Sequence, residues 1–357
     1  MSRAHAAQPA SLGHPARPTA LDWFQRGIFC LLFAVPLVTT IYAGYYFEPA
    51  EGHPPDYAIY LNASSLIQQG RASQLYDLAL QRENLAAITA ERYREFIVWN
   101  HAPLEALLYY PAAWFSFQDG YEGARAINSL VVLLLAVWFV LRVEFRESAM
   151  LSGTLVAFAG IRLLSSAINM GQDSSWILAV VLAAMEALRR GRDRLTGVLL
   201  GLAAVKITIV LPLLAVLFVA GYRRAAAIGI GAALAGFAVS TLVLGWSAVA
   251  GFFALLVHLI GVDGEYGLYA DQLWNFRGVL IPFLGATTAV FLLTMLGGLA
   301  GAFLTARLPK RYIPGAALLV AAFFSPHLYR HDAVFYIGGA LLLLVAKADH
   351  ASRPSAC

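Results

Sequence analysis

The chain has 357 residues, of which 60% are hydrophobic and 13% are charged, and its mean hydropathy is +0.68. Soluble domains are about 45–50% apolar and about 25% charged, so this composition excludes an ordinary soluble domain and predicts several membrane spans. The net charge of +4 is typical of basic cytoplasmic loops and does not indicate nucleic-acid binding. Cys30 and Cys357 are too few to form a disulfide framework.

Residues 1–20 are rich in Ala, Pro, His and Arg without a hydrophobic period, so we expect them to be disordered. Residues 27–46 form an apolar stretch of about 20 residues, which is long enough to cross a bilayer. No convincing cleavage site follows this stretch, so it is predicted to be an uncleaved anchor and not a signal peptide. We expect a single integral-membrane domain at 21–349 and a short tail at 350–357.

A polar loop of roughly 50 residues, at 47–100, follows the first span and is too long for a simple turn. Within it, 57–69 and 74–95 carry apolar residues near one helical face, with charged residues concentrated in the second stretch. Amphipathic helices beside a membrane tend to lie in its interface, and this is the predicted arrangement. A small solvated cap is the alternative. A second, shorter polar loop is predicted at 248–276.

The remaining chain is a rapid succession of hydrophobic segments, which predicts an all-α transmembrane bundle with about ten membrane segments in total. After the first span, the segments lie at 101–118, 124–142, 149–168, 174–189, 195–219, 225–246, 277–304, 312–329 and 333–346. Pro103 and Pro111 interrupt the first of these segments, so it is a candidate for an incomplete crossing.

Basic residues predict the orientation, because short cytoplasmic loops are enriched in Lys and Arg. The clusters at 189–194, 223–224 and 307–311 should therefore be cytoplasmic, and the two polar loops should face outward. The first two clusters flank a single segment, 195–219, and cannot both be cytoplasmic if that segment crosses once. Either one loop violates the rule, or the segment enters and returns as two half-helices. We favour the second arrangement, because Lys206 near its middle is costly in hydrocarbon.

Asp56 lies just beyond the first span, after two prolines, where a carboxylate can act on a substrate whose tail is in the bilayer. It is the best candidate for a general base that takes a proton from an attacking hydroxyl group. The alternative is that Asp56 caps a helix beginning at Tyr57, and the two roles are compatible.

Lys206 and His327 are the best candidates to contact the phosphate of a lipid-phosphate leaving group, whose negative charge grows as the bond breaks. A lysine that extends to the membrane surface, and a plain loop around His327, are the alternatives. Gln172 lies in a polar hinge that is either a simple outside turn or a binding element. No His or Cys pair has metal-ligand spacing, so no metal site is predicted. Other ionisable residues in or near spans are also functional candidates: Asp77, His101, Glu105, Arg162, Asp173, His258, Arg330, His331 and Asp332.

The order of several short motifs resembles glycosyltransferase family 87, whose members include polyprenol-phosphate-mannose-dependent α-1,2-mannosyltransferases of the GT-C fold. The matching stretches are Asp56-Tyr57 with Tyr60, Leu75-Tyr76-Asp77, Ala102-Pro103, Gly171-Gln172, the basic run from Arg189 followed by Lys206, and Ser325-Pro326-His327-Leu328-Tyr329 with Asp332. The resemblance covers most of the chain.

This resemblance implies a hexosyltransferase that moves a hexose, with mannose expected, from a polyprenyl-phosphate sugar to a lipid or polysaccharide acceptor. The transfer is expected to be a single displacement that inverts the configuration of the anomeric carbon. It implies Asp56 as the general base and no cofactor beyond the lipid-linked donor. Residues expected to bind substrate are Lys206, His327, Tyr60, Asp77, Gln172, Tyr329, Arg330 and Asp332. The expected location is the cell membrane, with the active site on the extracytoplasmic side. A lipid-linked sugar flippase and a non-catalytic polysaccharide assembly factor are the alternatives.

Overall fold

The computed structural model describes residues 20–351, apart from 47–52, 94, 145, 261, 263, 266–268, 270 and 271. Every regular element within these ranges is a helix, and an isolated β-bridge joins Leu273 to Tyr329. The all-α prediction is therefore confirmed. The terminal segments expected at 1–20 and 350–357 lie almost wholly outside the described residues.

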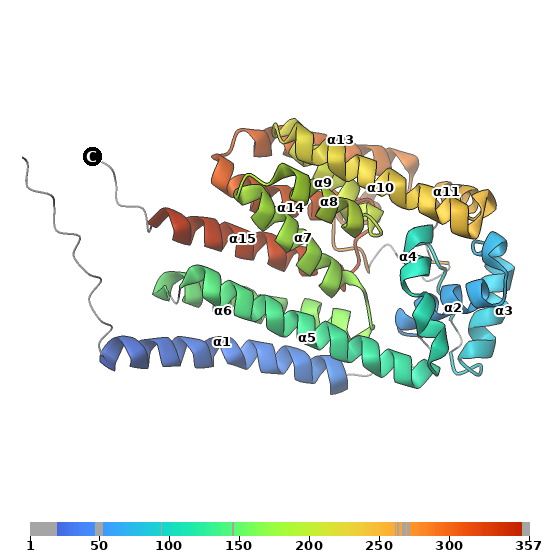
Figure 1. The fold of residues 1–357 in the computed structure, drawn as a ribbon, viewed down its shortest axis with the longest axis horizontal. Helices are drawn as coiled ribbons and strands as arrows, with labels where there is room; N and C mark the ends of the chain where they lie inside the picture. The colour runs from blue at the N-terminus through green and yellow to red at the C-terminus, as the bar shows by residue number, and fades with distance from the viewer. Residues whose placement is uncertain are drawn as a thin grey trace, which may run out of the picture.

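Three long helices lie side by side along one side of the molecule (Figure 1). They are α1 (Ala20–Tyr46), α5 (Phe117–Val143) and α6 (Glu147–Asn169). Glycines allow the close approach: a Cβ at Gly44 would lie 2.6 Å from Ile168, and one at Gly153 would lie 2.3 Å from Phe139. Small residues at such contacts let membrane helices pack tightly in the absence of a hydrophobic driving force.

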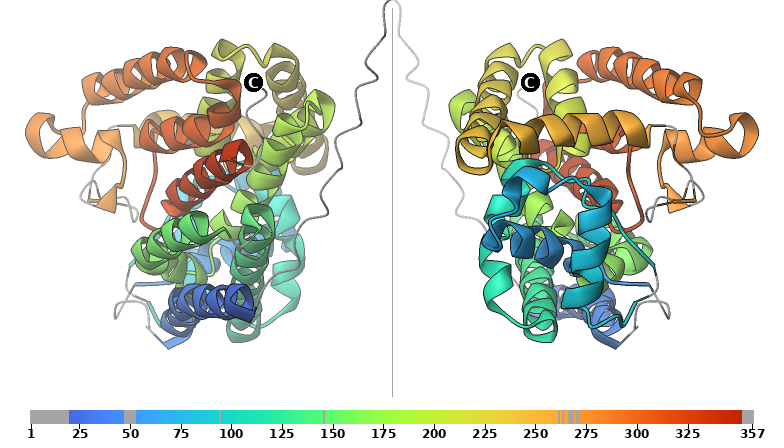
Figure 2. Two further views of the ribbon diagram at one scale, coloured as in Figure 1. Left: turned by 90° about the vertical axis from the view of Figure 1, so that its left-hand side faces the viewer. Right: turned by 90° about the vertical axis from the view of Figure 1, so that its right-hand side faces the viewer.

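The second half of the chain forms the rest of the bundle, with α12 and α13 displaced to one side (Figure 2). Its helices are α7 (Ser174–Arg189), α8 (Asp193–Ala203), α9 (Ile207–Val219), α10 (Arg223–Leu244), α11 (Trp246–Leu259), α12 (Phe276–Leu284), α13 (Thr288–Ala306), α14 (Ile313–Phe323) and α15 (Val334–Ala351). The second polar loop is therefore shorter than predicted, because α11 occupies its first half.

Five helices in the described residues are long and apolar enough to cross a membrane: α1, α5, α6, α10 and α13. The structure supports a helical membrane protein but not ten continuous spans, because several predicted segments are short or broken. The segment at 101–118 contains only α4 (Pro103–Leu108) and the 3₁₀ helix η2 (Tyr110–Trp114), as its prolines indicated. The segment at 277–304 is interrupted between α12 and α13, where Gly285 has a φ of +74°.

The predicted break in the segment 195–219 is present, with Lys206 between α8 and α9. Helix α8 runs parallel to α10: a Cβ at Gly197 would contact Ala225, and one at Gly201 would contact Ala232 further along both helices. The basic residues that precede α8 and those that begin α10 therefore lie at the same end of the bundle. This is the arrangement predicted for two half-helices that enter and return.

The first loop folds into a helical unit at the opposite end of α1 from its start (Figures 1 and 2). It contains α2 (Tyr57–Gln68), the 3₁₀ helix η1 (Ala72–Gln74) and α3 (Leu78–Ile88). The helices occur near their predicted positions. However, every residue of α2 from Tyr57 to Ser64 is buried, so α2 is a core element and does not lie as an amphipathic helix in the membrane interface.

Candidate active site

A cavity of about 1120 Å³ extends among α9, α11, α13 and α14 and reaches the loops beside α2. Between the helices its walls are apolar and include Leu211, Phe253, Met295 and Leu299. Near the loops its walls are polar, formed by His53, Asp56, Gln172, Lys206, Arg277, His327, Arg330, His331 and Asp332. These polar residues all lie outside the five candidate spans. A cavity with apolar and polar parts is suited to an amphiphilic ligand.

Asp56 occupies the position before α2, but its side chain makes no capping hydrogen bond to that helix. Its Oδ2 atom instead accepts a hydrogen bond from Gln172 Nε2 at 2.8 Å and lies 3.3 Å from His331 Nδ1. The side chain lines the cavity, and the residue is only 8% exposed. Of the two roles considered from the sequence, helix capping is therefore absent, and the carboxylate faces the cavity.

The backbone holds Asp56 and Gln172 together. The Tyr57 N–H donates to Met170 O at 2.9 Å, and Asn128 Nδ2 donates to Gln172 O at 2.7 Å. Gly171 has a φ of +62°, which favours glycine, and a Cβ there would lie 2.9 Å from Tyr57 Cβ. The glycine turn therefore allows α2 and the hinge before α7 to approach closely enough for the side chains to meet.

His331 lies between two carboxylates. Its Nδ1 is 3.3 Å from Asp56 Oδ2, and its Nε2 is 3.5 Å from Asp332 Oδ2 and 3.1 Å from Gln172 Nε2. Gln172 Nε2 is a donor, so a ring that accepts at Nε2 carries its proton on Nδ1, the nitrogen beside Asp56. The sequence marked His331 as an unusual polar residue but gave it no role, because nothing local indicates that it meets a residue near the start of the chain.

Lys206 is held between two carboxylates at the break in the helix. Its Nζ lies 2.7 Å from Asp173 Oδ1 and 2.9 Å from Asp332 Oδ1, and Ser174 Oγ donates to the same Asp332 oxygen at 2.5 Å. Burial disfavours the charged forms of all three side chains, but the attraction between the ammonium group and the two carboxylates is larger than this cost. The pKa of Lys206 is consequently raised, and the pKa values of Asp173 and Asp332 are lowered.

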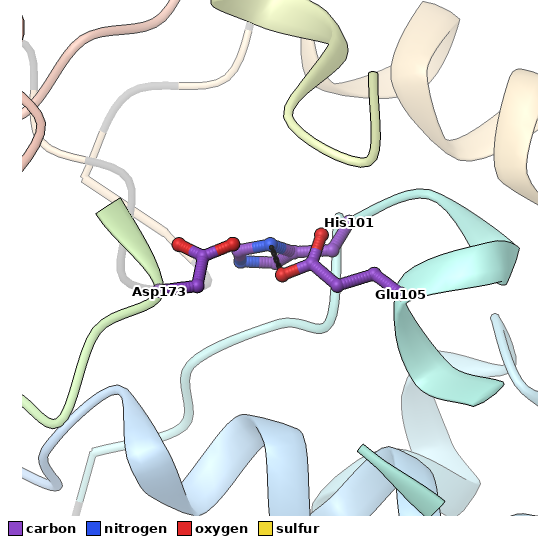
Figure 3. Close-up of side chains that lie close together, drawn as sticks. All are labelled: His101, Glu105 and Asp173. Carbon is purple, nitrogen blue, oxygen red and sulfur yellow. Dashed lines mark ion pairs between the residues drawn. The ribbon is translucent and has the colours of Figure 1, made fainter. Parts of the chain in front are cut away.

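A second cluster adjoins Lys206 through Asp173. Figure 3 shows the side chains of His101, Glu105 and Asp173 converging, with Asp173 on the opposite side from Glu105. His101 Nδ1 lies 2.9 Å from Glu105 Oε1, and its ring stacks on Trp99 with centroids 4.8 Å apart. Burial lowers the pKa of His101 to about 4. Burial, together with the nearby Asp173 charge, raises the pKa of Glu105 well above its usual range.

The loop before α15 supplies further predicted residues. His327 is neutral at pH 7, because burial lowers its pKa to about 3, and its ring packs edge-on against Tyr329 with centroids 4.5 Å apart. The Tyr329 hydroxyl accepts a hydrogen bond from Tyr269 N at 3.0 Å. Arg330 lines the cavity with Arg162 of α6, and burial and the Arg162 charge lower the pKa of Arg330. Among the described residues, no carboxylate pairs with either arginine.

Two predicted substrate-binding residues lie outside the cavity wall. Asp77 is exposed and caps α3, because its Oδ1 accepts from Ala79 N and Leu80 N, each at 3.0 Å. The structure therefore gives Asp77 a local role away from the cavity. Tyr60 is buried behind the cavity, and its hydroxyl donates to Gln172 Oε1. It can orient the amide that holds Asp56, but it does not face a ligand in the cavity.

Comparison with known proteins identifies one family. The family model of glycosyltransferase family 87 matches residues 99–346, which include the hinge at Gln172, Lys206 and the loop before α15. The match begins near the end of the first loop, so it does not include Asp56. No curated protein and no solved structure matches the chain.

Proposed function

Because the chain belongs to glycosyltransferase family 87, we propose that it transfers a hexose, with mannose as the first candidate, from a polyprenyl-phosphate sugar. The proposed acceptor is a lipid or a polysaccharide. The cavity supports a donor of this class, because its apolar part suits a polyprenyl tail and its polar part suits a sugar phosphate.

The observation that carries this proposal is the placement of Asp56. Its carboxylate does not cap α2 but faces the polar part of the cavity, held there by Gln172 and His331. A general base must lie within reach of the proton it takes, in a fixed orientation. Gln172 and His331 both contact Oδ2, which leaves Oδ1 for the acceptor hydroxyl. No described residue hydrogen-bonds to Oδ1.

In the proposed reaction, Asp56 takes the proton from the acceptor hydroxyl as its oxygen attacks the anomeric carbon. The bond between that carbon and the phosphate oxygen breaks in the same step, so the configuration inverts and polyprenyl phosphate leaves with the bonding electrons. A phosphate monoester has a second pKa of about 6, so this leaving group needs no acid catalyst. A single base is therefore sufficient, and His331 acts as a positioning residue for it.

We assign the donor phosphate to Arg330 and Arg162, in place of the Lys206 and His327 expected from the sequence. Two carboxylates already neutralise Lys206, and burial keeps His327 uncharged. The two arginines line the same cavity without a carboxylate partner among the described residues. A guanidinium group also matches the geometry of phosphate oxygens better than an ammonium group does.

The proposed site faces the extracytoplasmic side of a cell membrane. The basic residues beside α8 and α10 lie at one end of the bundle, and the helix break at Lys206 lies in the bundle beyond them. Lys and Arg are enriched in cytoplasmic loops, so the end that carries the first loop is assigned to the outside.

The test is a transfer assay on the full chain in lipid nanodiscs, with radiolabelled polyprenyl-phosphate mannose and membrane glycolipids as acceptors. Asp56→Asn should lower the turnover by at least about a hundredfold, the typical size of a general-base contribution. Asp77→Asn is the matched control, since asparagine also caps helices, and it should retain turnover. Wild-type turnover in Asp56→Asn would remove Asp56 from the mechanism.

The same assay separates the alternatives. A transferase releases polyprenyl phosphate in step with the appearance of labelled product. A flippase would move the labelled lipid across the bilayer without cleaving it, and the break at Lys206 is a feature that transporters also use. An assembly factor would do neither, and replacing Asp56 would not change its function.

A further inference from the structure

The cluster of His101, Glu105 and Asp173 has the composition and proximity of a metal site. One ligand atom from each residue lies within 4.8 Å of the others. Glu105 and Asp173 are completely buried, and His101 lines the cavity. Figure 3 shows that the three side chains point toward one another from two separate segments, the region of α4 and the turn before α7.

The hydrogen bonding of the cluster is incomplete. Both carboxylate oxygens of Glu105 and Oδ2 of Asp173 are buried without a hydrogen-bond partner. His101 Nδ1 lies 2.9 Å from Glu105 Oε1, but the contact does not have hydrogen-bond geometry. Buried carboxylate oxygens that lack donors are costly, so either a bound cation or a proton shared by the two carboxyl groups must lie between them.

The local charge balance supports the same requirement. Lys206 is the cation of this region, and its contacts go to Asp173 and Asp332. Among the described residues, no lysine or arginine forms an ion pair with Glu105, although the Lys206 charge lies near enough to act on it. Asp173, Asp332 and Glu105 therefore present three buried carboxyl groups to one ammonium group. A divalent cation between Glu105 and Asp173 would give their unpaired oxygens a positive partner.

We propose that His101, Glu105 and Asp173 bind a divalent transition-metal cation of the Mn²⁺ or Zn²⁺ class. One imidazole nitrogen with two carboxylate oxygens is a mixed donor set that these ions accept, whereas Mg²⁺ and Ca²⁺ prefer oxygen alone. The ion ties α4 to the turn that carries Gln172, the residue that holds Asp56. Of the three ligands, His101 lines the cavity.

The sequence did not indicate this site, and its spacing had predicted no metal. His101 and Glu105 are separated by one helical turn, but the third ligand comes from a distant segment. The proposal also does not depend on the sugar donor, because metal binding is measured without any substrate. If the transfer assay fails, the proposed metal site still stands, and if no metal binds, the proposed transferase function still stands.

The experiment uses the full chain in detergent, first treated with chelator and then titrated with Mn²⁺. Binding is followed by the loss of the electron paramagnetic resonance signal of free Mn²⁺. We expect one tightly bound Mn²⁺ for each chain. Glu105→Gln should weaken this binding at least tenfold, since even the loss of outer-shell partners costs about 10–100-fold. Glu83→Gln, which removes an exposed carboxylate, should leave it unchanged.

A second measurement on the wild-type chain does not depend on whether a variant folds. Pulsed electron paramagnetic resonance of bound Mn²⁺ should show the nitrogen coupling of a coordinated imidazole, which His101→Asn should abolish. Absence of the nitrogen coupling would overturn the proposal. So would equal Mn²⁺ and Zn²⁺ binding by wild type and Glu105→Gln, which would mean that the two carboxyl groups share a proton instead.

Discussion

Replacing Lys206 by methionine tests whether the buried charge cluster stabilises the fold. The Lys206 side chain is 6% exposed, and its ammonium group contacts Asp173 at 2.7 Å and Asp332 at 2.9 Å. Two charge-assisted hydrogen bonds of about 1.5–3 kcal/mol each amount to roughly 3–6 kcal/mol. Removing one partner of a buried ion pair costs about 3–5 kcal/mol. We therefore expect the free energy of unfolding to fall by about 4 kcal/mol at pH 7.5.

The loss should depend on pH. In the wild type, the pKa values of Asp173 and Asp332 are lowered by Lys206 against the effect of burial, so their stabilisation is present above an ordinary aspartate pKa and is lost as the pH falls through the lowered values. In the variant, burial acts without the lysine and raises both pKa values. The variant therefore gains stability relative to the wild type as the pH falls, by about 1.4 kcal/mol per pH unit for each carboxyl group that binds a proton.

The assay is equilibrium unfolding in mixed micelles at pH 7.5 and 5.5, with Lys310→Met as a control that removes an exposed lysine. The control should change stability by less than about 0.5 kcal/mol. The double variant Lys206→Met with Asp332→Asn should recover part of the loss, because it leaves one fewer unpaired carboxylate. A loss below about 1 kcal/mol, or one that does not shrink at pH 5.5, would refute the reasoning.

Two further predictions concern the positioning of the site. Gly171→Ala forces a positive φ on an L-residue, which costs about 1–2 kcal/mol, and also places a Cβ 2.9 Å from Tyr57 Cβ. Gly191→Ala has a similar φ of +69° but nothing within 4 Å, so thermal unfolding should show a smaller loss, and only Gly171→Ala should reduce transfer. Arg330→Gln should lower kcat/KM for the lipid-linked donor by roughly tenfold to a hundredfold, the effect of losing one charge-assisted hydrogen bond of about 1.5–3 kcal/mol. Arg92→Gln, at an exposed position, should not change it, and equal rates in both arginine variants would contradict the phosphate assignment.

The sequence alone determined the features that depend on local composition. Hydropathy indicated a helical membrane protein, and runs of apolar residues located most of the helices. The position of one lysine between two basic clusters predicted the break between α8 and α9. A charged residue in hydrocarbon is costly, so a lysine in the middle of an apolar segment indicates a break in the chain itself.

The number of spans could not be predicted in the same way. An apolar segment has the same hydropathy pattern whether it crosses the bilayer, packs inside the protein or breaks into two helices. The residues of α2 illustrate the limit, because the amphipathic pattern of the first loop predicted an interfacial position and packing buried them instead. Burial depends on the neighbours that the fold supplies, and local hydropathy does not specify them.

Only the tertiary structure decided how the polar residues combine. Asp56 was a candidate base from its place beside the first span, but its partners Gln172 and His331 are 116 and 275 residues further along the chain. Asp77 was expected from the sequence to bind substrate, and in the structure its side chain caps α3. Hydrogen bonds and ion pairs act over about 3 Å, so they depend on the packing of whole helices and leave no periodic pattern in the sequence by which they could be recognised.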